Sequence, residues 1–420
     1  MANRRITFID LFAGAGGLSE GFVRAGFEPV AHIEMNSMAC RTLETREAYF
    51  FLKKKHRLDH YRQYEQGLIS REQLLSEVPS ELLDKVINKE MSEQSLDDIF
   101  ANVDDLMKMQ KVKKINVVIG GPPCQAYSLV GRAQSKHMKH PMSEDPRNYL
   151  YRMYTRFLER YQPDMFVFEN VGGITTAQAG KAFEGIKREL TRIHYHMEAH
   201  MQRAVDFGVL QNRKRMIIIG WKEKTDFYYP AFPAQISDAY VNDLLDDLPP
   251  LKRGGSSDHY FKPFNETSAY IRKNHIREKD DVLTEHLCRN NNDRDVKIYR
   301  KAIEAWNNNH SRLKYDELPD ELKTHKNQTS FLDRFKVVEG DCHYCHTVLA
   351  HLAKDGHYFI HPDIHQCRSI SVREAARLQT FPDNYYFEGG RTAAFVQIGN
   401  AVPPLMAKGI AEEIKKQFQG

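Results

Sequence analysis

A short apolar run that ends in a sharp, rigid turn constrains this chain more than any other feature. Residues 115–119 read Ile-Asn-Val-Val-Ile and are predicted to form a buried strand, and residues 120–123, Gly-Gly-Pro-Pro, turn the chain directly after it. Cys124 follows this turn, at the edge of an α/β sheet, where nucleophiles are usually displayed. We therefore predict that Cys124 acts in covalent catalysis, and the alternative is a buried structural thiol.

A glycine-rich loop follows an earlier predicted strand, which ends at residues 10–12. Three glycines between residues 14 and 17 allow a tight turn into a helix. The loop is not the Gly-x-Gly-x-x-Gly of dinucleotide enzymes, and it has no phosphate-binding lysine. The next predicted strand, residues 29–33, ends at Glu34, whose carboxylate can bind both hydroxyls of a ribose. This combination suits an adenosyl cofactor without a phosphate, of which S-adenosylmethionine is the obvious member.

Two further segments place charged side chains at strand ends. The apolar residues 164–168 lead to Glu169, which is expected at the same sheet edge as Cys124, with a helix cap or a salt bridge as its alternative role. Arg213 and Arg215 stand at alternate positions before the apolar residues 216–219. Alternate positions face one way, so the two arginines are predicted to converge on one anion or base. A solvated basic edge that protects the strand from aggregation is the other interpretation.

Composition narrows the class of protein. A chain of 420 residues, of which 41% are apolar, can bury a large core and is predicted to form two domains. No apolar run approaches the ~20 residues of a membrane span, and the first ten residues do not resemble a secretory leader. Six cysteines without regular spacing fit a reducing cytosol better than a disulfide scaffold. A net charge of +4 permits nucleic-acid binding without demonstrating it.

Taken together, these segments resemble the bacterial DNA (cytosine-5)-methyltransferases of the restriction–modification type, in the order in which that family has its motifs. The resemblance implies an α/β fold, with a Rossmann-like, mixed and mainly parallel sheet and a second, smaller target-recognition domain. It places the catalytic domain at residues 1–225, the recognition domain at 226–391 and a returning segment at 392–420. The matching segments are residues 10–17, 122–125, 169–171, 211–215, 373–382 and 397–404.

The same resemblance assigns a mechanism to the predicted catalytic residues. The thiolate of Cys124 would add to carbon 6 of a flipped-out cytosine, because carbon 5 is too weakly nucleophilic to take a methyl group directly. Glu169 would hold and protonate N3 of the ring. Arg213 and Arg215 would lower the pKa of the Cys124 thiol. Gln125 follows the nucleophile and is counted with the catalytic residues.

The resemblance also implies binding residues. Phe12 would flank the adenine, Glu34 would hold the ribose and Asn400 would close over the cofactor. An aspartate is expected at the strand end before Cys124, and Asp104 is favoured over Asp105. Ser128 and Thr347 are expected to contact substrate DNA, and no metal ligand is assigned. The full set implied for S-adenosylmethionine is Asp10, Phe12, Ala13, Gly14, Gly16, Gly17, Glu34, Asp104, Pro122, Leu150 and Asn400.

Two intervals depart from compact members of the family. Residues 45–93 form a charged, helix-prone insertion, interpreted as a solvated helical hairpin, with contact to flanking DNA phosphates as the alternative. Residues 222–366 show no sheet-like regularity and are rich in asparagine, which is typical of target recognition. Within them, Cys342 and Cys345 have the Cys-x2-Cys spacing of a zinc site, but no second pair has clean ligand spacing, so the nearby histidines are interpreted as loop residues near DNA.

The function predicted from the sequence is therefore methylation of carbon 5 of cytosine in a specific duplex DNA sequence. Two alternatives remain: methylation of a tRNA cytosine, and DNA binding by a catalytically silent homologue. The expected partners are double-stranded DNA and a cognate restriction endonuclease or defence-system proteins. The chain is expected to be a cytoplasmic monomer with no membrane association. The sequence does not define the methylated site, nor whether the role is restriction, another defence system or regulation by an orphan enzyme.

Overall fold

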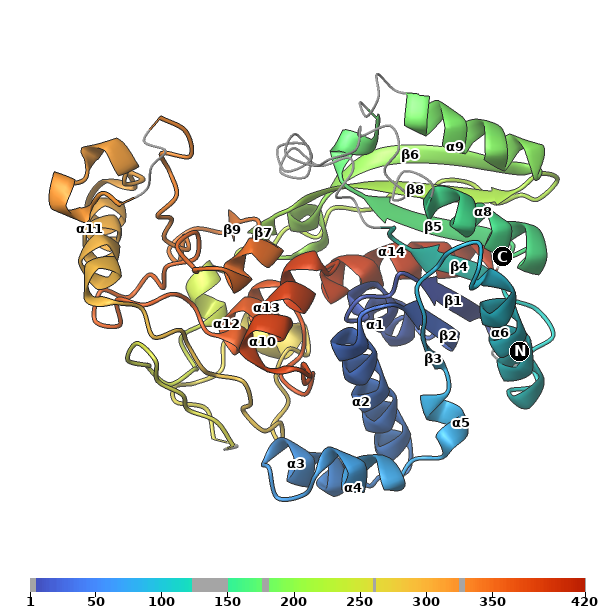
Figure 1. The fold of residues 1–420 in the computed structure, drawn as a ribbon, viewed down its shortest axis with the longest axis horizontal. Coiled ribbons are helices and arrows are strands. Elements are labelled where there is room, and N and C mark those ends of the chain that lie inside the picture. Colours follow the sequence, from blue (N-terminus) through green and yellow to red (C-terminus); the bar gives the residue numbers. More distant parts are fainter. Residues whose placement is uncertain (1–4, 123–149, 176–180, 260–261, 325–328, 420) are drawn as a thin grey trace.

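A seven-stranded sheet forms the centre of one half of the molecule, at right in Figure 1. The computed structural model describes residues 5–122, 150–175, 181–259, 262–324 and 329–419. The strand order is β3-β2-β1-β4-β5-β8-β6. The first five strands are parallel, and β8 pairs antiparallel with both β5 and β6, which confirms the mixed, mainly parallel sheet. The strands are β1 (Thr7–Leu11), β2 (Glu28–Glu34), β3 (Val86–Asn88), β4 (Val117–Gly120), β5 (Met165–Asn170), β6 (Tyr195–Arg203) and β8 (Lys214–Lys222).

Helices cover both faces of this sheet, because its central strands are apolar on both sides. On one face Ile9, Val118 and Phe166 pack with α6 (Leu96–Met109), α8 (Leu150–Tyr161) and α9 (Lys181–Arg192). On the other face Phe8 and Ile119 pack with α1 (Gly17–Arg24) and α14 (Pro404–Gln417). The C-terminal helix therefore packs in the same cluster as the N-terminal strand.

The insertion predicted over residues 45–93 to be a solvated helical hairpin is helical between residues 37 and 83, but it is not solvated throughout. It forms four helices, and its apolar side chains, among them Leu52 and Leu74, make a buried cluster of their own. Arg46 is buried as well, with its guanidinium paired to Glu20 and hydrogen-bonded to Asn384. The prediction of a solvated segment was wrong because polar residues expected to face solvent, such as Arg46, are buried and pair with residues of other segments. The contact with flanking DNA phosphates stays a prediction. The helices are α2 (Ser37–Lys54), α3 (Leu58–Glu65), α4 (Arg71–Ser76) and α5 (Ser80–Leu83).

The region after β8 has little regular structure. In the described part of residues 223–366, β9 (Cys345–His346) is the one strand, and it pairs with β7 (Gln211–Asn212). This agrees with the predicted lack of sheet-like regularity. Helices and 3-10 turns are otherwise spaced by long loops. They are α10 (Ala269–Lys273), α11 (Asp293–Asn309), α12 (Val372–Leu378), α13 (Gly390–Asn400), η7 (Val241–Leu244), η8 (Tyr315–Glu317), η9 (Asp320–Leu322) and η10 (Ala350–Ala353). Two further 3-10 turns, η4 (Gly172–Thr175) and η6 (Ala204–Phe207), precede β8. Among the described residues no helix has the length and apolar character needed to cross a membrane.

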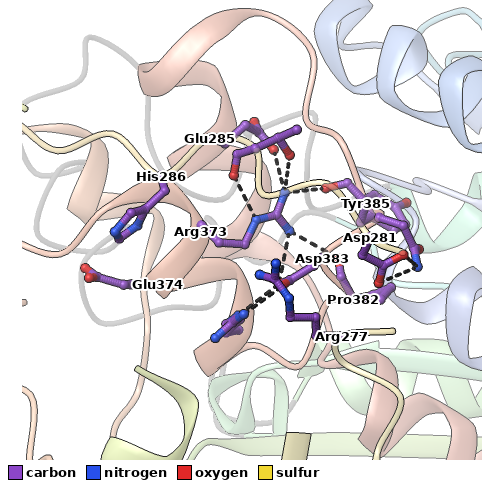
Figure 2. Close-up of polar contacts among 12 residues, drawn as sticks. Arg277, Asp281, Glu285, His286, Arg373, Glu374, Pro382, Asp383 and Tyr385 are labelled. Carbon is purple, nitrogen blue, oxygen red and sulfur yellow. Dashed lines mark hydrogen bonds and ion pairs between the residues drawn. The ribbon is translucent and has the colours of Figure 1, made fainter. Parts of the chain in front are cut away.

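Buried ion pairs hold the loops of this region together (Figure 2). Arg373 and Arg377, both in α12, have no solvent exposure. Arg373 donates to Thr284, Glu285 and the carbonyl oxygens of Pro382 and Tyr385. Arg377 donates to both carboxylate oxygens of Asp383, at 2.9 and 2.6 Å. Although burial acts to raise it, the charge of Arg377 lowers the pKa of Asp383 to about 2.

We expect Asp383→Asn to lower the free energy of unfolding by about 3–5 kcal/mol, because it removes one of the two carboxylates that pair with the buried Arg377 and a carboxylate that pairs with the buried Arg277. The folded-state pKa of Asp383 lies below its unfolded value of about 4, so the contribution is complete above about pH 5 and falls only as the pH drops towards 2. The loss measured by urea denaturation should thus be constant from pH 6 to 8.

Asp320→Asn is the matched control, because Asp320 is exposed and pairs only with Lys323 one turn away among the interactions described. It should change the unfolding free energy by less than about 0.5 kcal/mol. An equal effect of the two substitutions would contradict the structural role of the buried pair.

Candidate active site

A cavity of about 1210 Å³ opens at the carboxyl ends of β1, β2, β4 and β5. This is the edge at which open α/β sheets bind ligands. Eleven of the residues predicted for the site line this one cavity although they are far apart in the sequence. They are Asp10, Phe12, Ala13, Gly14, Gly17, Glu34, Pro122, Leu150, Glu169, Arg215 and Asn400. Cys124, Gln125 and Ser128 lie outside the described residues.

The glycine-rich loop between β1 and α1 takes the tight turn that its sequence predicts. Gly14 and Gly16 have φ angles of 55° and 76°, in the left-handed region that glycine adopts without strain. Gly16 does not line the cavity; a Cβ at this position would lie 2.7 Å from a methyl group of Leu43. A Cβ on Gly17 would clash with the carbonyl oxygen of Val402. The glycines thus let the loop turn and let the C-terminal segment pack directly against it.

Glu34 ties this loop to the end of β2. Its carboxylate accepts hydrogen bonds from the backbone N–H groups of Gly14 and Asn36, each at 2.8 Å. Asn36 in turn caps α2, because its side chain accepts from the first backbone N–H groups of that helix. The acid predicted to bind ribose is therefore held in one orientation at the cavity wall.

An ion pair between neighbouring strands stands at the other end of the cavity. Arg215 Nε lies 2.7 Å from Glu169 Oε1, and both side chains are 13% exposed. Gly121 approaches this pair closely, since a Cβ there would lie 2.8 Å from Glu169 Oε2. Asn170 donates to the carbonyl oxygen of Pro122 at 3.3 Å. The chain that leads to Cys124 thus leaves its strand beside the acid and the arginine.

Arg213 does not converge with Arg215. It is fully buried, and its guanidinium donates to the carbonyl oxygens of Val348, at 2.8 Å, and Gly399, at 3.3 and 3.4 Å. The two arginines share the less exposed side of the chain, as alternation predicts, but the backbone is interrupted at Arg213 between β7 and β8. Arg213 therefore joins three segments away from the cavity, and neither convergence on a ligand nor a solvated edge describes it.

The predicted position of Asp104 is wrong. Asp104 and Asp105 both lie inside α6 and not at a strand end, and Asp104 pairs with Arg160 at 2.5 Å. The strand that precedes β4 is the short β3, and the residues that follow it, 89–94, line the cavity. The sequence signal for β3 is one Val-Ile pair, which is too short to outweigh the helical pattern around it.

Other cavity residues were not identified from the sequence. Arg152, in the first turn of α8, lines it, and so do Thr392 and Val396 of α13.

Thr347, predicted to contact DNA, follows β9 and donates to the carbonyl oxygen of Asn212 at 2.7 Å. Cys345 is buried in the apolar cluster around α12 and α13, whereas Cys342 packs at the edge of the cluster on α11. No group of three or more His, Cys, Asp or Glu side chains that could hold a metal ion is found in the described part of the chain.

Most of the chain resembles one known protein family and its members. The chain matches the model of the family described as C-5 cytosine-specific DNA methylase over residues 6–74 and 83–416. It is 41% identical over 445 residues to the Type II methyltransferase M.Bpa9945I of Bacillus paralicheniformis, with 98% of this chain and 99% of the relative covered. It is 28% identical over 438 residues to the Type II methyltransferase M.DdeI of Desulfomicrobium norvegicum, with 99% and 89% covered.

Solved structures share the fold at lower identity. A protein of E. coli whose title describes a putative DNA modification methyltransferase encoded within a prophage aligns with a TM-score of 0.63 at 22% identity, covering 99% of this chain and 100% of that one. The Dnmt2 methyltransferase of S. pombe aligns with a TM-score of 0.53 at 13% identity, covering 99% of both chains. The Rossmann-like fold and the resemblance predicted from the motifs are confirmed. The chain belongs to the family of C-5 cytosine-specific DNA methylases.

Proposed function

We propose that this DNA cytosine-5 methyltransferase binds S-adenosylmethionine in the 1210 Å³ cavity and acts through covalent addition of Cys124 to the target base. Members of the family generally use this cofactor. One observation carries the proposal: the Glu169–Arg215 ion pair and the glycine-rich loop line the same cavity. Cys124 follows Pro122, another residue of that cavity, after a single intervening residue.

The described residues fit the cofactor chemically. The ring of Phe12 and the apolar side chains of Ile33 and Leu150 suit an adenine, and Glu34 suits ribose hydroxyls. Asp10 lines the same cavity, and its carboxylate suits a cationic group. When bound, S-adenosylmethionine supplies an electrophilic methyl group on its sulfonium.

The chain's own residues would perform the remaining chemistry. The thiolate of Cys124 would form a bond to carbon 6 of the cytosine while Glu169 delivers a proton to N3. Carbon 5 would then take the methyl group and lose its proton to a base. As the carbon–sulfur bond breaks, Cys124 would leave as the thiolate and N3 would return its proton to Glu169. Arg215 would hold the Glu169 carboxylate in place through the 2.7 Å ion pair. A base inside a duplex must be flipped out before these groups reach it.

Sequence recognition is assigned to residues 226–391. Their long loops supply polar side chains outside the sheet, and Thr347 lies at the junction with β7. We also propose a cognate restriction endonuclease or defence-system proteins as biological partners, and the similarity to Type II methyltransferases supports this proposal. We further propose that the chain acts as a monomer in the cytoplasm, where its DNA substrate lies.

Cys124→Ser tests the covalent step. Duplex DNA with 5-fluorocytosine in the target site should form a stable adduct with the wild-type protein, because fluorine does not leave as a proton does. Gel electrophoresis under denaturing conditions should show no adduct for the serine variant. Cys342→Ser is the control, since that cysteine packs at the edge of the cluster on α11, does not line the cavity and should leave the adduct intact. An adduct in the Cys124→Ser variant would exclude Cys124 as the nucleophile.

Glu169→Gln tests the acid that faces Arg215. It should slow single-turnover methyl transfer by about 100-fold or more, the usual scale for a lost acid–base group, and leave cofactor affinity within about twofold. Glu198→Gln, an exposed change on β6, should have no effect on the rate. A normal rate for Glu169→Gln would remove this residue from the mechanism.

Recognition is tested by exchanging residues 222–367 for the corresponding interval of a relative with a different known target. Bisulfite sequencing of plasmid DNA from cells that express the hybrid should show methylation at the relative's site, because base-edge contacts worth ~1–3 kcal/mol each set the sequence. A hybrid that methylates the original site would place recognition elsewhere. Tritiated methyl transfer to tRNA, measured in parallel with the unaltered protein, should be absent.

A further inference from the structure

A line of four neighbouring charged side chains begins at the cavity with Asp10 and continues through His32, Glu47 and Lys85. His32 Nδ1 lies 3.8 Å from Asp10 Oδ2, and His32 Nε2 lies 3.6 Å from Glu47 Oε1. Lys85 Nζ contacts the other oxygen of Glu47 at 3.0 Å. Asp10 is 1% exposed and His32 is 3% exposed. Neither the motifs nor the proposed mechanism uses His32, Glu47 or Lys85.

The sheet register explains why these groups meet. Asp10 in β1 and His32 in β2 are partners in a parallel pair, so their side chains emerge side by side on one face. Helix α2 contacts β2 and carries Glu47. Ser19 of α1 lies 3.5 Å from His32 Nδ1, and the ring of Phe8 meets the imidazole edge-on. The imidazole is thus enclosed between two carboxylates, with no solvent.

The electrostatics favour a charged imidazole. Each ring nitrogen faces a carboxylate, and only the imidazolium carries a hydrogen on both. Although burial acts to lower it, Asp10 and Glu47 raise the pKa of His32. Although burial acts to raise it, Lys85 and His32 lower the pKa of Glu47. With all four groups ionised, two cations balance two carboxylates, which a buried cluster requires.

Asp10 is the member of the line that reaches the cavity, and its charge depends on the others. Burial raises the pKa of Asp10 above its ordinary value; His32 counteracts this increase, and the nearby Glu34 adds a smaller one. Without the imidazolium, both burial and Glu34 would favour the protonated, neutral form of Asp10. The ionisation of Asp10 therefore depends on His32, which does not line the cavity.

We propose that His32 is a positioning residue that keeps Asp10 ionised, so that the cavity selects the cationic end of S-adenosylmethionine. Glu47 and Lys85 support His32, which gives the helices of residues 37–83 a part in cofactor binding. This inference rests on the proposed cofactor site. The sulfonium and ammonium groups of the cofactor are the positive charges that an ionised Asp10 would attract.

Isothermal titration of the DNA-free protein tests this directly. Two ligands are compared, S-adenosylmethionine and the neutral 5′-methylthioadenosine, which retains the adenosine but has neither positive charge. His32→Gln should weaken binding of S-adenosylmethionine about tenfold and change that of methylthioadenosine less than twofold. Asp10→Asn should do the same. The double variant should bind no more weakly than Asp10→Asn alone, because His32 acts through Asp10.

The controls separate the possible failures. His200→Gln removes an exposed imidazole beside Glu198 and should leave both affinities unchanged. Glu47→Gln keeps the imidazole in place and should lower affinity for S-adenosylmethionine alone; it decides the question if His32→Gln does not fold. Equal losses for both ligands, or additive losses in the double variant, would overturn the inference. A wild-type protein that binds neither ligand would overturn the proposed cofactor site itself.

Discussion

A charge removed from water must meet a partner, and this constraint determines how the irregular half of the molecule is held. The region after β8 has few backbone ladders to fix its loops. Arg373 and Arg377 hold these loops instead, because their guanidinium groups donate hydrogen bonds to loop residues more than 80 positions away in the sequence. Losing one acceptor would leave a buried charge less well compensated, so these loops are bound to α12 as a unit.

The same principle connects the loops to the cofactor cavity. Arg46 of α2 pairs with Glu20 of α1 and donates to Asn384, which follows α12. Tyr385, the next residue, donates through its hydroxyl to the carbonyl oxygen of Ala15 in the glycine-rich loop. The cavity wall therefore depends on a segment near the C-terminus and on helices between β2 and β3. The insertion that the sequence presents as charged surface is part of the support of the site.

Arg213 and Arg215 are two positions apart but have different roles, because the strand is interrupted at Arg213. Arg215 enters β8 beside Glu169 and lines the cavity, where a charge pair can act on a ligand. Arg213 precedes the strand and donates to the carbonyl oxygens of Val348 and Gly399, and so joins β7 to α13. A guanidinium with several donors in a fixed plane suits both tasks. The sequence pattern alone treats them as one pair.

Sequence patterns predict where the central strands end, and with them the positions of several site residues. Short, mainly apolar segments indicate β1, β2, β4 and β5, and an acid at the end of three of these segments was expected at the sheet edge, where Asp10, Glu34 and Glu169 line the cavity. The positions and roles of the other residues depend on contacts that form only in the folded chain. Asp104 was misplaced because β3 has too few residues to give a periodic signal, and His32 was overlooked because one histidine in a buried strand carries no pattern. Its partners Asp10 and Glu47 are distant in sequence, and charge compensation among buried groups exists only once the chain has brought them together.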